Sequence, residues 1–106
     1  NHKLEITTGN VTITQIKDYV VDLFIMGTCA IDSKIGITAS YYEEAGLKKN
    51  MIMSSRKTIA LVNHKAINDK AAFKVCEMDL IDTIITDLSS NDKKLDDFRF
   101  CKVKIV

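Results

Sequence analysis

Small and polar residues that could contact a ligand follow directly after the most apolar stretch of the chain. The apolar run 20–26 ends at Gly27, and Thr28, Cys29 and Asp32 come next. Glycine has no Cβ and therefore lets a ligand approach the backbone closely. A carboxylate accepts hydrogen bonds from hydroxyl groups. This arrangement is typical of a small-molecule pocket at the carboxyl end of a buried strand.

These residues also have structural interpretations, which the sequence leaves open. Gly27 and Thr28 suit a plain tight turn, and Asp32 suits a turn capped through the backbone amides of residues 33–34. Further along the chain, Thr38 offers a hydroxyl to a ligand or serves as a β-branched strand residue.

Two lysines could supply the charge that holds a phosphate group. Lys48 lies four residues after Glu44, so its structural alternative is an exposed ion pair worth about 0.2–0.5 kcal/mol. Lys65 and Asn63 follow a second apolar run, and an amide can both donate to and accept from a sugar hydroxyl. His64 could bind phosphate or transfer a proton, although a loop histidine without an identifiable partner more often does neither.

Runs of apolar residues predict the strands that would position these groups. Strands are expected at 20–26, 58–62, 82–87 and 100–106. The first three have no polar face, so the segments 21–26, 58–62 and 82–86 are expected to be the most buried. Asp82 and Asp87 bracket the third run and are expected to orient loops rather than to catalyse a reaction.

Helical spacing of apolar residues alternates with these strands. It predicts helices at Tyr41–Ser55 and from Asn91 to Phe98. Strands separated by helices imply right-handed crossovers, and therefore an α/β fold with a mostly parallel sheet and helices on its faces. The amino-terminal patterns are weaker: Lys3–Thr7 suits a short strand, and Ile13, Ile16 and Val20 have helical spacing.

Composition excludes several classes of protein. The chain has 106 residues and a formal net charge of +1, which predicts a single domain without a nucleic-acid surface of its own. It has no apolar run of about 18 residues and no signal segment, which predicts a cytoplasmic protein without a membrane partner. Cys29, Cys76 and Cys101 lie in apolar stretches and are expected to be buried reduced thiols. No zinc spacing and no nucleotide-binding glycine motif occurs, so no metal and no cofactor is predicted.

Several short motifs in fixed order resemble the C-terminal effector-sensing domain of the DeoR family of bacterial transcription repressors. The resemblance runs from about Gly9 to the end of the chain. It is carried by Asp22, Gly27, Ile31-Asp32, Gly36, Thr38, Glu43-Glu44-Ala45, Lys48-Lys49, Met51-Ile52 and the segment from Ile81 to Asp87.

The resemblance implies a fold similar to ribose-phosphate isomerase and the CoA transferases. It also implies that a winged helix-turn-helix and the first sensor strands, with a phosphate-cradling glycine loop, precede Asn1, so that the chain is a fragment. DNA would be bound only through that missing domain. The implied effector is a phosphorylated sugar or polyol, and a homo-oligomer is expected because palindromic operators mirror protein symmetry.

The chain departs from the family pattern at two places. Cys29-Ala30 stands where the family usually has Asx-Gly, which removes a polar ligand group. Asn63-His64-Lys65-Ala66 stands where the family usually has Asp-x-x-Lys, so the acid is replaced by a neutral amide. These replacements leave three classes open: an effector sensor, a sugar-phosphate isomerase-like enzyme with Asp32 or Glu44 as base, and a ligand-free dimerisation domain.

The sensor class is preferred, without catalytic residues. Its ligand-binding residues are predicted to lie after the strands and on the first helix. They are Gly27, Thr28, Cys29, Asp32, Thr38, Lys48, Asn63 and Lys65.

Overall fold

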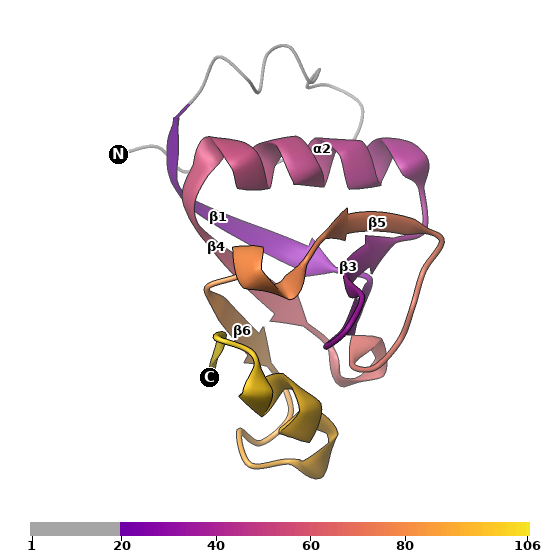
Figure 1. The fold of residues 1–106 in the computed structure, drawn as a ribbon, viewed down its shortest axis with the longest axis vertical. Helices are drawn as coiled ribbons and strands as arrows, with labels where there is room; N and C mark the ends of the chain where they lie inside the picture. The colour runs from indigo at the N-terminus through magenta and orange to yellow at the C-terminus, as the bar shows by residue number, and fades with distance from the viewer. Residues whose placement is uncertain (1–19) are drawn as a thin grey trace.

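A computed structural model describes residues 20–106 (Figure 1). The short strand expected at Lys3–Thr7, and nearly all of the helix expected around Ile13 and Ile16, lie outside the described residues. None of the described helices is long and apolar enough to cross a membrane.

Among residues 20–106, four parallel strands form the main sheet. They are β1 (Val21–Thr28), β4 (Ser55–Val62), β6 (Thr83–Thr86) and β7 (Lys104–Ile105), in the order β1-β4-β6-β7. Thr28 pairs with Val62, and Val62 pairs with Thr86. The carboxyl ends of β1, β4 and β6 therefore lie side by side at one edge of the sheet. The predicted mostly parallel sheet is confirmed, with a β7 much shorter than the strand expected at 100–106.

Helix α2 (Tyr42–Ser54) lies in the connection between the two long strands, β1 and β4, and covers one face of the sheet (Figure 1). Ala45, Met51 and Ile52 are its buried residues. Glutamates in its first turn favour the positive end of the helix dipole. The helix passes directly into β4 at Ser55. Its observed bounds match the predicted helix within one residue at each end.

The second face of the parallel sheet corrects one expectation. Ile25, Leu61 and Ile85 are exposed by 37%, 42% and 39%, and β1 is an edge strand among the described residues. The prediction that the segments 21–26, 58–62 and 82–86 are the most buried is therefore wrong for residues 20–106, where β3 is buried at every position. An apolar run supplies side chains suited to burial on both faces of a sheet, but burial also needs another element that covers each face. No element within residues 20–106 covers Ile25, Leu61 and Ile85 completely.

A second, antiparallel sheet was not expected. It consists of β2 (Ala30–Asp32), β3 (Gly36–Ala39) and β5 (Phe73–Cys76), in the order β2-β3-β5. The expected strands, at 20–26, 58–62, 82–87 and 100–106, include none of its three members. Ile31 and Ile37 pair across the hairpin and are almost completely buried, so burial stabilises strands too short to show a period.

Three 3₁₀ helices complete the described chain: η1 (His64–Ala66), η2 (Met78–Leu80) and η3 (Lys93–Phe100). The last replaces the α-helix expected from Asn91 to Phe98. Leu95 and Phe98 are fully buried, and their spacing of three residues suits a helix with three residues per turn. Asp92 caps η3 by accepting a hydrogen bond from the backbone N–H of Lys94 at 2.9 Å.

Candidate functional site

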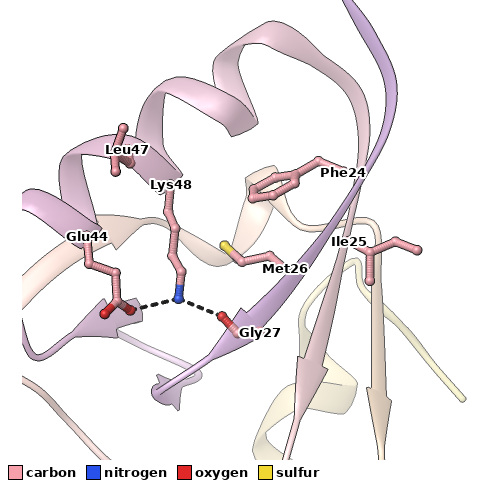
Figure 2. Close-up of a pocket in the computed structure, with 7 residues that line it drawn as sticks. All are labelled: Phe24, Ile25, Met26, Gly27, Glu44, Leu47 and Lys48. Carbon is pink, nitrogen blue, oxygen red and sulfur yellow. Dashed lines mark hydrogen bonds and ion pairs between the residues drawn. The ribbon is translucent and has the colours of Figure 1, made fainter. Parts of the chain in front are cut away.

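A pocket of about 260 Å³ lies between β1 and α2 (Figure 2). It is lined by Phe24, Ile25, Met26, Gly27, Glu44, Leu47 and Lys48. The side chains of Phe24 and Met26 point toward the helix, whereas that of Ile25 points to the opposite side of β1 (Figure 2). The pocket thus has an apolar wall along the strand and a polar end near the strand's carboxyl terminus.

Lys48 joins the helix to the strand at this polar end. Its Nζ donates a hydrogen bond to the carbonyl oxygen of Gly27 at 2.7 Å and another to Glu44 Oε2 at 2.8 Å (Figure 2). Because an ammonium group has three donors, one remains for a ligand. The lysine and glutamate side chains are only 17% and 20% exposed, so the pair is better shielded from water than the exposed pair that the sequence suggested.

Glu44 is the acceptor at the centre of this network. The hydrogen bond from Lys48 lowers the pKa of its carboxyl below the usual value, so Glu44 is ionised at neutral pH. The Sγ of Cys29 donates a weaker hydrogen bond to the same oxygen, Oε2, at 3.3 Å. The polar end of the pocket therefore combines a cation and an anion, whose charges nearly cancel, with a neutral thiol.

The three cysteines are free thiols, but they differ in burial. Cys76 is buried, and burial raises its pKa to about 11. Cys101 is intermediate and Cys29 is exposed, so the expectation that all three are buried is wrong. Partial burial of the thiol, followed by its hydrogen bond to Glu44, still raises the pKa of Cys29 above the ordinary value.

The Glu44→Gln variant is expected to make Cys29 more reactive. The substitution removes a negative charge and leaves the Lys48 ammonium beside the sulfur, so the pKa of Cys29 falls and more thiolate forms at pH 8. We expect a rise of about two- to tenfold in the rate of iodoacetamide labelling, since one pKa unit changes the thiolate fraction about tenfold. Site-resolved mass spectrometry measures the rate, and Glu43→Gln is the matched control. Equal rates in wild type and Glu44→Gln would contradict the thiol–carboxylate contact.

The carboxyl end of β4 carries a second group of polar residues. Asn63 Oδ1 accepts a hydrogen bond from the backbone N–H of Lys65 at 2.9 Å, and the lysine is exposed. His64 does have a partner, which sequence reasoning missed. Its backbone N–H donates to Asp87 Oδ1 at 2.8 Å, and its Nδ1 lies 2.6 Å from Asp87 Oδ2.

Both aspartates around β6 make structural contacts with neighbouring parts of the chain. Asp82 Oδ2 accepts a hydrogen bond from the backbone N–H of Thr58 at 2.8 Å, and Asp87 holds the segment that follows β4. Each carboxylate therefore connects neighbouring parts of the chain.

Two of the predicted ligand residues are engaged within the protein. Asp32 Oδ2 accepts hydrogen bonds from the backbone N–H groups of Lys34 and Ile35 at 3.0 and 2.9 Å, and the bond from Ile35, foremost, lowers the pKa of this carboxyl. Thr38 Oγ1 accepts from the backbone N–H of Ala71 at 2.8 Å, and Thr38 is only 4% exposed. These contacts match the structural alternatives, while a ligand-binding role for either residue stays a prediction.

Among the predicted ligand residues, Gly27 and Lys48 line the pocket, Thr28 follows on the same strand, and Cys29 reaches it through Glu44. Sequence reasoning missed the apolar wall. The sequence did contain a signal for this wall. Phe24 and Met26 are two residues apart, so in a strand their side chains lie on the same face. Within residues 20–106, no group of three or more His, Cys, Asp or Glu side chains could hold a metal ion.

Comparison with known proteins agrees with the resemblance seen in the sequence. Residues 1–88 match the family described as the DeoR C terminal sensor domain. The chain is 31% identical over 83 residues to the HTH-type transcriptional repressor GlcR of Bacillus subtilis, covering 78% of this chain and 32% of that protein. It is 27% identical over 78 residues to the glycerol-3-phosphate regulon repressor of Haemophilus influenzae, covering 74% of this chain and 31% of that protein. The chain spans about a third of the length of these relatives, and it belongs to the family of DeoR C-terminal sensor domains.

Proposed function

We propose that this chain belongs to a transcriptional repressor and binds a phosphorylated sugar or polyol between β1 and α2. The observation that carries this proposal is the Gly27–Lys48–Glu44 network at the polar end of an apolar-walled pocket. In α/β sheets, ligands bind at the carboxyl ends of the strands. One relative is named after the glycerol-3-phosphate regulon, and glycerol 3-phosphate is a phosphorylated polyol.

The nearly neutral Lys48–Glu44 pair is better suited to hydroxyl groups than to a free phosphate. A carboxylate accepts hydrogen bonds from hydroxyls, and the remaining ammonium donor gives one back. In this proposal the phosphate lies toward the exposed Lys65 and the neighbouring Asn63. Thr28 would contact the part of the ligand between this phosphate and the Lys48–Glu44 pair. Cys29, Asp32 and Thr38 complete the proposed binding residues.

The proposed mechanism is thermodynamic linkage. A ligand that binds one conformation of the repressor more tightly than another shifts the population by its differential affinity. Because α2 and β1 form opposite walls of the pocket, a bound effector would link their separation to its own binding energy. A helix-turn-helix domain elsewhere in the full-length protein would read this change as altered affinity for DNA. We place the protein in the cytoplasm as a homo-oligomer.

Two carboxylates were candidates for the base of an isomerase, and their environments support a protein that is not an enzyme. Proton abstraction is most efficient when the pKa of the base lies near the working pH. Hydrogen bonds lower the pKa of both Asp32 and Glu44 instead, which weakens each as a base. We expect no turnover of pentose or hexose phosphates above a buffer blank. Turnover that is lost in Asp32→Asn would move the protein to the enzyme class.

A thermal-shift panel on the full-length protein tests the proposal. Its probes are glycerol 3-phosphate, hexose 6-phosphates and pentose 5-phosphates, each beside the unphosphorylated parent compound. A ligand that binds only the folded state stabilises it, by about 2.7 kcal/mol at a ligand concentration of 100 times Kd, and so raises the melting temperature. We expect at least one phosphorylated probe to raise the melting temperature and its parent to do so much less.

A positive probe is then added to the protein bound to operator DNA, where it is expected to change the affinity. A full panel without any shift would contradict the sensor proposal and favour the ligand-free dimerisation domain. In that case Cys29, Ala30 and Ala66 are the first residues to change back to those of the family pattern, to test whether ligand binding returns.

A further inference from the structure

His64 is held in place at two points by one carboxylate. Its backbone N–H donates to Asp87 Oδ1 at 2.8 Å, and its ring Nδ1 lies 2.6 Å from Asp87 Oδ2. Two bonds to the same side chain fix both the start of η1 and the orientation of the imidazole. This is more than a loop connection requires, because the backbone contact alone would join the ends of β4 and β6.

The contact with Asp87 also determines what the other ring nitrogen can do. A carboxylate only accepts hydrogen bonds when it is ionised, and the hydrogen bond from His64 lowers the pKa of Asp87. The proton on the imidazole therefore lies on Nδ1. Nε2 is left to accept a hydrogen bond from a hydroxyl group. The His64 side chain is 43% exposed, so solvent and ligands can reach it.

His64 lies at the same edge of the sheet as the carboxyl end of β1, which borders the proposed pocket. Val62 pairs with Thr28 on one side and with Thr86 on the other. His64 follows Val62 by two residues, and it lies between Asn63 and Lys65 in the sequence. Aligned parallel strands bring their following residues to a common edge of the sheet, where ligands bind.

We infer that His64 is a further effector-binding residue, whose Nε2 forms a hydrogen bond with an oxygen of the bound sugar or polyol phosphate, and that Asp87 is its positioning residue. The inference rests on the proposed function and adds a residue to its site. It is independent of the Lys48 network, because it uses the opposite strand of the β1–β4 pair.

Two substitutions separate this inference from a purely structural role. Asparagine places its amide nitrogen near the position of Nδ1, so His64→Asn can keep the bond to Asp87 but has no counterpart of Nε2. Glutamine reaches the position of Nε2 but is poorly placed for Asp87. The full-length protein is titrated calorimetrically with glycerol 3-phosphate and with a hexose 6-phosphate, and melting temperatures are measured without ligand.

We expect His64→Asn to melt near the wild type yet to bind the positive probe about two- to tenfold more weakly, the loss expected for one hydrogen bond between uncharged groups. His64→Gln should retain more of the affinity, and Asp87→Asn should lose affinity because the ring is no longer oriented. Unchanged affinity in both His64 variants, beside a wild type that binds, would overturn this inference alone. A wild type that binds neither probe would overturn the inference together with the proposed function.

Discussion

Alanine in place of Gly36 is expected to abolish folding or to lower the melting temperature by more than about 10 °C. The backbone at Gly36 has φ of +100°, and a Cβ there would lie 2.0 Å from the carbonyl oxygen of Cys76. The atoms it would meet belong to the backbone of β5 and the residue after it, so no side chain can rotate away. The pairing of Ile37 with Cys76 would have to open.

The size of this effect follows from two costs. A left-handed backbone costs a non-glycine residue about 1–2 kcal/mol, and separating two paired strands adds more. A total of about 3–5 kcal/mol is in the range of the most damaging single substitutions. In a domain of about 100 residues, each kcal/mol lowers the melting temperature by about 4–8 °C.

Gly27→Ala is the matched control for thermal unfolding. A Cβ at Gly27 would meet nothing within 4 Å, so this variant should melt within a few degrees of the wild type. Similar melting temperatures for the two variants would contradict the close approach of β3 and β5. Because Gly27 lines the pocket, the control also reports whether a methyl group there weakens effector binding.

The parallel sheet was predictable because its information is local. Each long strand is a run of apolar residues, and α2 carries buried residues at helical spacing with acids in its first turn. Such patterns specify an element without reference to the rest of the chain. Their parallel arrangement followed from the helical connections between them, which imply crossovers.

The antiparallel sheet was not predictable because its information is distant. β2 has three residues and β5 has four, too few to show a period of two. The strand conformation of β5 depends on pairing with β3, which joins residues as far apart in sequence as Ile37 and Cys76. The need for glycine at position 36 likewise comes from the carbonyl of Cys76, a contact that no local pattern contains.

The candidate site shows the same division. The i, i+4 spacing revealed the pair of Glu44 and Lys48, but its shielding and the bond to Gly27 depend on how α2 lies over β1. His64 and Asp87 are 23 residues apart in sequence. Their contact depends on the register between β4 and β6, so the histidine could only be interpreted as having no partner.

Lys48→Ala is expected to weaken effector binding by at least about tenfold. It removes the one cation among the described residues that line the pocket, and loss of a hydrogen bond to a charged group typically costs about 1.5–3 kcal/mol. Calorimetric titration of the full-length protein with the positive probe measures the change. Lys49→Ala, an exposed neighbour on the same helix, is the control for net charge and should bind like the wild type.

A substitution of its partner, Glu44, tests how the lysine acts. Glu44→Gln keeps the ammonium but frees it from its carboxylate, so a probe that contacts Lys48 through phosphate should bind this variant more tightly. A probe that uses the pair through its hydroxyls should bind it more weakly, because the charged acceptor is lost. The proposed placement of hydroxyls at the pair predicts the second result. Unchanged affinity in a Lys48→Ala, Lys65→Ala double variant would contradict both, since neither lysine would then contact the effector.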